Sequence, residues 1–239
     1  MKGYIYIASA FGTVNRSPCG QAGSSIDNDP HFWTSPPTWG ICRNDLRAGA
    51  NVGDFVFFVL PRHGRHPQMI FAYLRIAEKI THVEAFARPS LLLKRMGDKV
   101  PNGNIIVDST GGYNKLDYDK HLYKFDKIKN HYAVGDETAS RMLTSKEIQA
   151  LAPQFVSTLS SIVGVSGSRA IDIISRKGRI LTARQVRLLL RWLRRQILST
   201  TGTAANGAWH IKPPHRACGR DTLPRRARRP SACRLPDRF

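Results

Sequence analysis

The sequence lacks several features that would place it in a well-defined class. No apolar run reaches the roughly 18 residues that indicate a membrane span, and the first residues do not follow the layout of a signal peptide. Only four cysteines occur, widely spaced and without a CxxC pair. A disulfide scaffold and a cysteine-rich zinc site are therefore disfavoured. We expect a cytoplasmic protein with no membrane contact.

Recognised catalytic and cofactor motifs are also missing. The sequence contains no phosphate-binding glycine loop, no dinucleotide fingerprint, no zinc-protease helix and no serine-hydrolase elbow. His63 and His66 are three residues apart, but they lie in a basic, proline-flanked loop without nearby acidic residues or cysteine. A metal site there is disfavoured. We assign no metal, no cofactor and no catalytic residue.

Acidic residues are scarce in the last third of the chain. The whole sequence has 37 Lys and Arg against 17 Asp and Glu, a net charge of +20. Residues 1–167 carry only +5 of this, whereas residues 168–239 carry +15. Such a concentration of positive charge attracts phosphate polyanions and releases their counterions. It predicts nucleic acid or a nucleotide as the partner, although a basic segment that only adds solubility stays an alternative.

Residues 1–135 have the pattern of a β-rich domain. Aromatic and β-branched runs predict strands at residues 4–9, 54–61, 69–80, 104–109 and 121–128. The run at 54–61 is continuously apolar, which is typical of a central buried strand, and we expect it to pair with 69–80. A short helix interrupted by Pro89 is expected over residues 84–96. Short strands with one or two small helices favour a compact β-barrel of mixed topology.

Residues 136–199 have helical periodicity. Thr144 followed by Glu147, and Thr182 followed by Gln185, are capping boxes that precede amphipathic runs. Two sets of apolar residues recur at helical spacing: Ile148, Leu151, Phe155, Leu159 and Ile162 in the first helix, and Val186, Leu189, Leu190, Leu193 and Ile197 in the second. The opposite face of the second helix carries Arg184, Arg187, Arg191, Arg194 and Arg195.

Residues 200–239 change composition abruptly. They contain eight Arg, one Lys and five Pro, with almost no periodicity. Two interpretations stay open: a disordered arginine-rich arm that folds on nucleic acid, or read-through sequence after a frameshift.

Two tryptophans suggest a stacking site. Trp33 and Trp39 flank a Pro-Pro turn in an otherwise polar loop, and indoles at the mouth of a barrel can hold a flat base. We expect both to face a cavity.

Three runs in the first domain resemble a known family. They are TWGICRNDLRAGANVGDFVFFV at 38–59, MIFAYLRIAEKITHVEAFARPSLLLKRMG at 69–97 and NGNIIVD at 102–108. In order and spacing they are similar to the nucleotide-modification-associated domains of the PUA-like superfamily, which includes EVE, ASCH and YTH domains. The resemblance covers residues 2–132. It implies a small β-barrel that holds a modified base in an aromatic pocket, in bacterial or phage systems that modify or sense nucleic acid.

The resulting expectation is an α+β fold: a PUA-like barrel over residues 1–135, a helical extension over 136–199 and a disordered tail over 200–239. Its function would be that of a non-catalytic reader of modified bases in DNA or RNA. The expected base-binding residues are Trp33, Trp39, Gly40, Phe58 and Asn104. The expected phosphate-binding residues are Lys94, Arg95, Lys124, Arg187, Arg191 and Arg194.

Two alternatives belong to other classes. One is an enzyme that modifies or hydrolyses a nucleotide with His121, Lys124 and Asp126, although on a regular strand His121 and Asp126 would point to opposite faces. The other is an adaptor whose helices bind a protein.

Overall fold

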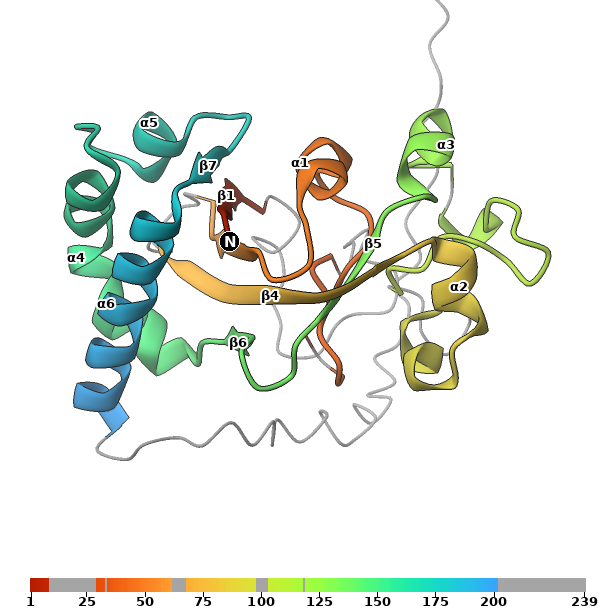
Figure 1. Cartoon of the computed structure of the whole chain (residues 1–239), viewed down its shortest axis with the longest axis horizontal. Coiled ribbons are helices and arrows are strands. Elements are labelled where there is room, and N and C mark those ends of the chain that lie inside the picture. The colour runs from red at the N-terminus through yellow and green to blue at the C-terminus, as the bar shows by residue number, and fades with distance from the viewer. Residues whose placement is uncertain (9–28, 33, 62–67, 98–102, 118, 202–239) are drawn as a thin grey trace, which may run out of the picture.

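The centre of the protein is a twisted sheet built on one long strand (Figure 1). The computed structural model describes residues 1–8, 29–32, 34–61, 68–97, 103–117 and 119–201. Strand β3 (Phe55–Val59) lies between β1 (Gly3–Ile7) and β4 (Ile70–Ile80). It pairs parallel to β1 and antiparallel to β4. The predicted pairing of the two apolar runs is confirmed.

The sheet does not close into a barrel within the described residues. Its order is β2-β5-β4-β3-β1-β7, so β2 (Thr38–Trp39) and β7 (Arg179–Leu181) form the two edges. Strand β5 (Tyr132–Gly135) pairs with the second half of β4, and β6 (Arg141–Met142) pairs with the first half. The α+β class is confirmed. The expected closure is absent because the outer edge of β1 is occupied by β7.

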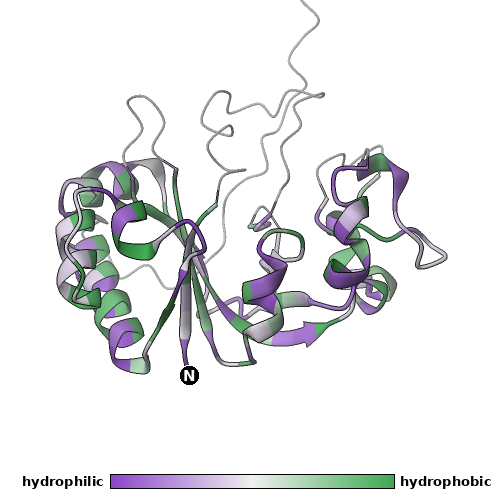
Figure 2. Cartoon of the chain, turned by 90° about the horizontal axis from the view of Figure 1, so that it is seen from above, coloured by the Kyte–Doolittle hydropathy of each residue, from purple (hydrophilic) through white to green (hydrophobic). Residues whose placement is uncertain are grey.

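Alternate residues of the central strands enter different cores. Ile5, Phe57 and Tyr73 face a core shared with the C-terminal helices, whereas Tyr6 and Phe58 face the opposite core. Because both faces are covered, β3 is apolar at every position, as the sequence predicted. Figure 2 shows the C-terminal helices gathered on one side of the strands and a second group of helices on the other.

The C-terminal helices begin where the sequence predicted. Helix α4 (Ser145–Val163) has the capping box of Thr144 and Glu147, and α6 (Ala183–Thr201) has the reciprocal hydrogen bonds of Thr182 and Gln185. Most of the predicted apolar residues on these helices are buried, and Ile148 and Ile162 are partly buried. The structure adds α5 (Ala170–Ile174) and strand β7 between the two helices.

Two expected strands are not strands. Residues 104–109 make single bridges only, from Ile105 to Arg95 and from Val107 to Tyr113. Residues 121–128 form the turn η4 (Leu122–Lys124) and helix α3 (Phe125–Ile128). Over residues 121–128 the reason is local, because backbone N–H groups such as those of Leu122 and Lys124 bond to carbonyl oxygens three positions earlier. At 104–109 the N–H groups of Ile105 and Ile106 bond instead to the carbonyl oxygen of Lys94 and to Nδ1 of His82.

The other elements described within the first 135 residues are short helices. They are α1 (Asn44–Gly49), α2 (His82–Ala87), η2 (Pro89–Lys94) and η3 (Lys115–Asp117). The expected helix broken at Pro89 corresponds to α2 and η2. No helix of the described residues is long and apolar enough to cross a membrane.

The C-terminal helices and the sheet share one core. Strand β7 pairs with β1, and buried residues of α4, α5 and α6 pack on residues of β1, β3 and β4. Residues 136–201 are therefore integrated with the sheet. The tail was expected to begin at residue 200, but residues 200 and 201 belong to α6. The remainder of that tail, 202–239, lies outside the described residues, as do His63 and His66.

The turn before β7 approaches β1 closely at Gly178. Gly178 has a φ of +76°, and a Cβ there would lie 2.9 Å from the carbonyl oxygen of Ile5. Gly164 has a similar φ of +75°, but nothing lies within 4 Å of its Cβ position.

We expect Gly164→Ala to cost about 1–2 kcal/mol of unfolding free energy, the cost of a left-handed backbone. Gly178→Ala should cost at least about 1 kcal/mol more, because it adds steric overlap with β1. Urea denaturation of the two variants measures the difference. Equal losses would show that the turn does not pack tightly on β1.

Candidate functional site

A cleft of about 340 Å³ lies beyond the end of β1. Its walls come from the last residues of β1, the segment between β2 and α1, and the η4–α3 region. The lining residues are Tyr6, Ile7, Ala8, Ile41, Cys42, Arg43, Asn44, His121, Tyr123, Lys124 and Ile128. This volume falls at the lower end of the range for small-ligand sites, about 300–1,000 Å³.

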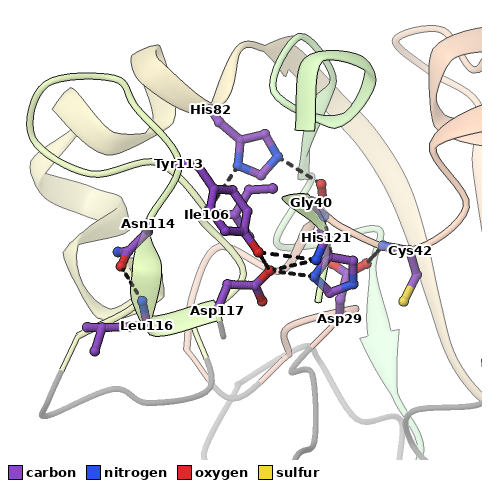
Figure 3. Close-up of polar contacts among 10 residues, drawn as sticks. All are labelled: Asp29, Gly40, Cys42, His82, Ile106, Tyr113, Asn114, Leu116, Asp117 and His121. Carbon is purple, nitrogen blue, oxygen red and sulfur yellow. Dashed lines mark hydrogen bonds and ion pairs between the residues drawn. The ribbon is translucent and has the colours of Figure 1, made fainter. Parts of the chain in front are cut away.

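The fully buried Asp29 fixes the wall that contains Cys42 (Figure 3). Its carboxylate accepts hydrogen bonds from the backbone N–H of Gly40 at 2.6 Å and of Cys42 at 2.5 Å. Asn104 donates to the same carboxylate at 3.1 Å. Charge-assisted hydrogen bonds in a buried site are strong, so this wall is held rigidly.

His82 fixes the other side of Gly40. Its Nε2 donates to the carbonyl oxygen of Gly40 at 2.8 Å, and its Nδ1 accepts from the backbone N–H of Ile106 at 3.2 Å. Only a neutral imidazole makes both bonds, because Nδ1 must be unprotonated. Burial, with Arg47 as a secondary cause, lowers the pKa of His82 to about 3.

On the opposite wall, His121 is paired with a buried carboxylate. Its Nδ1 lies 2.8 Å from Oδ2 of Asp117, whose side chain is 1% exposed, whereas that of His121 is 17% exposed. The same Oδ2 accepts from the Tyr113 hydroxyl and from the backbone N–H of His121. Burial and the bond to Asp117 raise the pKa of Tyr113. A carboxylate in this position orients an imidazole ring.

The cleft has an aromatic and cationic rim. Tyr123 is 75% exposed, and the Lys124 ammonium lies 4.7 Å from the centre of its ring. Arg43 is held by Asp45 at 2.6 Å and donates to the carbonyl oxygens of Arg176 and Lys177. The exposed residues Arg176 and Lys177 therefore extend the positive rim toward β7.

The expected stacking pair is not placed at a cleft. Trp39 is completely buried, with its ring 5.8 Å from that of Tyr6 and 6.1 Å from that of Phe58. Phe58 is also completely buried. Both side chains belong to the core on the Tyr6 face of the sheet, so neither has a face open to a base. Trp33 lies outside the described residues.

The expected base-edge residues are occupied by internal hydrogen bonds. Asn104 is buried; its amide donates to Asp29 and Thr38, and its Oδ1 accepts from the Tyr132 hydroxyl at 2.7 Å. Gly40 has both backbone polar groups paired, and a Cβ there would lie 2.5 Å from the carbonyl oxygen of Asn104. These two residues build the wall of the cleft rather than its lining.

Lys94 and Arg95, which were expected to contact phosphate, have contacts within the protein. Lys94 is fully buried, and its Nζ lies 2.9 Å from the carbonyl and hydroxyl oxygens of Thr34 and 3.1 Å from Nδ1 of His31. Burial lowers the pKa of Lys94 to about 7. The Arg95 guanidinium is 4.5 Å from the centre of the Phe86 ring, and its Nε is buried.

The other expected phosphate contacts are exposed. Lys124 lies at the cleft, and Arg187, Arg191 and Arg194 form an exposed face along α6. Helix α6 lies in the helical layer at one end of the molecule (Figure 1).

The alternative catalytic set is only partly assembled. His121 and Lys124 both line the cleft, whereas Asp126 is 87% exposed and pairs with Lys129 at 2.6 Å. The carboxylate that contacts His121 is Asp117, four residues earlier. Sequence reasoning missed Asp117 and Cys42. The i, i+4 spacing of Asp117 and His121 was the available signal, once this segment is read as helical turns.

Among the described residues, no group of three or more His, Cys, Asp or Glu side chains is arranged to hold a metal ion. No protein-family model matches the chain, and no curated protein matches it. The chemistry of the cleft is therefore the basis for assigning a function.

The burial of Trp39 predicts that its substitution destabilises the fold. We expect Trp39→Ala to lower the free energy of unfolding by about 3–5 kcal/mol, because it empties a large volume in the core. Tyr123→Ala, at an exposed aromatic residue, should change it by less than about 0.5 kcal/mol. Urea denaturation of both variants tests this. A Trp39→Ala protein as stable as the wild type would show that Trp39 is not a core residue, and Trp39 would again be a candidate for ligand binding.

The pKa of His82 predicts acid sensitivity. The unfolded state binds a proton at His82 below about pH 6.5, whereas the folded state does not until about pH 3. Above pH 6.5 the difference in proton binding does not affect the free energy of unfolding. Below pH 6.5 the unfolded state is stabilised by protonation, so the free energy of unfolding falls by about 1.4 kcal/mol per pH unit. Urea denaturation from pH 7 to pH 4 should show a shallower decline for His82→Gln than for the wild type. Parallel declines would contradict the neutral assignment.

Proposed function

We propose that the protein binds a nucleotide unit of DNA or RNA in the cleft between Cys42 and His121, with a modified base as the preferred ligand. The observation that carries this proposal is the pairing of exposed Tyr123 with Lys124 at the rim. An exposed aromatic face stacks on any base, and an adjacent ammonium binds its phosphate. A cleft of about 340 Å³ suits one nucleotide rather than a longer stretch.

Charge supports the same partner. The net charge is +20, and the exposed residues Arg176 and Lys177 lie next to Arg43 at the rim. The arginine face of α6 is a second basic surface, suited to phosphates without reading a base.

The preference for a modified base comes from the resemblance to the nucleotide-modification-associated domains of the PUA-like superfamily. We retain it as part of the proposal, together with a role in a prokaryotic or phage system that modifies or senses nucleic acid. In this assignment the reading site is the cleft at Tyr123, and the buried Trp39 and Asn104 support its wall.

The test is fluorescence anisotropy with short single-stranded oligonucleotides that carry modified or unmodified bases. Tyr123→Ala should weaken binding about ten-fold, because it removes a stacking contact of about 1–3 kcal/mol, and Tyr123→Phe should bind normally. Lys124→Gln should flatten the slope of log K against log salt by about 0.7. Lys146→Gln, at an exposed lysine of α4, is the matched control.

Equal binding by Tyr123→Ala and Tyr123→Phe would exclude stacking at the cleft. If only Arg187→Gln, Arg191→Gln and Arg194→Gln lowered the affinity, the contact surface would be α6. Absence of saturable binding would exclude the proposed partner altogether.

A further inference from the structure

The arginine face of α6 comprises five exposed residues. They are Arg184, Arg187, Arg191, Arg194 and Arg195. At 3.6 residues per turn, they fall within an arc of about 100° and span about 16 Å along the helix axis. The sequence of α6 contains no Asp or Glu to offset them. One side of this helix therefore presents a narrow row of positive charge.

This row of charge does not stabilise the fold. Arg187 and Arg191 are four residues apart, and like charges at this spacing repel each other across one helical turn. Arg184 is in the first turn, where a cation also opposes the helix dipole. Arg194 interacts with Tyr73, but within the part of the chain that the structure describes the other four side chains have no hydrogen-bond or ion-pair partner. The row therefore fits an anionic partner from outside the chain.

The apolar side of α6 is unavailable to a membrane. Val186, Leu189 and Leu193 are completely buried in the core that the C-terminal helices share with the central strands. Figure 2 shows this helical layer lying against the strands. An amphipathic helix binds a lipid surface by inserting its apolar side. Only the arginine face is open to a partner, so the partner is recognised by its negative charge.

The arginine face also lacks the aromatic contacts that a single strand requires. Trp192 is the aromatic residue of α6; it is half-buried, and its ring centre lies 6.3 Å from that of Phe155 in the core. Proteins hold single strands by stacking the bases on exposed aromatic rings. A duplex keeps its bases stacked on one another and presents its phosphates in regular rows at high charge density. Guanidinium groups at a fixed spacing suit such a row.

We propose that the arginine face of α6 binds the phosphate backbone of double-stranded nucleic acid without reading its sequence. None of the residues that line the cleft belongs to α6, so this contact is separate from the proposed nucleotide site. The inference goes beyond the proposed function, because it adds a duplex as a ligand to a protein whose cleft accommodates one nucleotide. It does not depend on what the cleft binds.

The test is fluorescence anisotropy of the full-length protein with a blunt-ended DNA duplex and with one of its strands, at several salt concentrations. In the triple variant Arg187→Gln, Arg191→Gln and Arg195→Gln, the affinity for the duplex should fall at least about ten-fold at low salt. The slope of log K against log salt should flatten by about 2–3, since each lost phosphate contact contributes about 0.9. The affinity for the single strand should fall by a smaller factor.

Two controls separate the arginine face from net charge. Lys115→Gln, Lys127→Gln and Lys146→Gln together remove the same charge from exposed lysines elsewhere, and this variant should keep the wild-type slope. The same three arginines changed to lysine keep the charge and should also keep the slope. The eight arginines of residues 200–239 are present in every variant, so a difference in slope comes from the substituted positions.

Urea denaturation shows whether each variant is folded. Because the arginines repel one another, the triple glutamine variant should be at least as stable as the wild type. If it nevertheless folds poorly, the single variants Arg187→Gln and Arg191→Gln carry the test, and each should flatten the slope by about 0.9.

An unchanged slope in the triple glutamine variant would overturn the proposal. An equal loss of slope in the lysine-to-glutamine control would attribute binding to net charge and would overturn it as well. Equal losses for duplex and single strand would contradict the preference for a duplex. If binding to phosphatidylserine vesicles fell as strongly as binding to the duplex, the partner would be a lipid surface instead. The expected loss of slope, combined with an empty cleft, would support this inference while excluding the proposed nucleotide site.

Discussion

The buried carboxylate of Asp29 is the contact on which the cleft depends. It replaces the water that Gly40 and Cys42 would otherwise bind, and it connects this segment to Asn104. A buried charge is tolerated only when its hydrogen bonds are satisfied, and three donors meet that condition here. Through Asn104, the network continues to Tyr132 on β5, so one wall of the cleft is continuous with the sheet.

The opposite wall depends on local turns. Residues 113–117 and 119–128 bond largely among themselves, and the Asp117 carboxylate is their centre. Their apolar contacts include Ile128 against a small cluster that contains Ile41. The cleft therefore joins a rigid wall, fixed by long-range polar contacts, to a wall built from short-range ones. A ligand that bridges Cys42 and His121 would contact both.

The elements that the sequence predicted correctly are those specified by residues close together in the chain. The capping boxes at Thr144 and Thr182, the amphipathic helices and the central apolar strand were all readable, because each is specified by neighbours in sequence. The parallel pairing of β1 with β3 and the occupation of its other edge by β7 were not, since they join residues far apart in the chain. The same limit applies to Trp39, whose polar sequence neighbours concealed a position in the core. His121 was identified from its type, but its partner depends on turns that resembled a strand.

The crowding at Gly40 has a consequence for evolution. No side chain fits there, since the carbonyl oxygen of Asn104 and the ring of Tyr132 both lie within 2.5 Å of where a Cβ would stand. Asp29 accepts from the backbone N–H of Gly40, and His82 donates to its carbonyl oxygen. A change at any of the three positions therefore removes at least one of these two hydrogen bonds. These residues should vary together across descendants of this gene. Their joint retention marks a homologue that keeps the cleft, even where the rest of the sequence has diverged beyond detection.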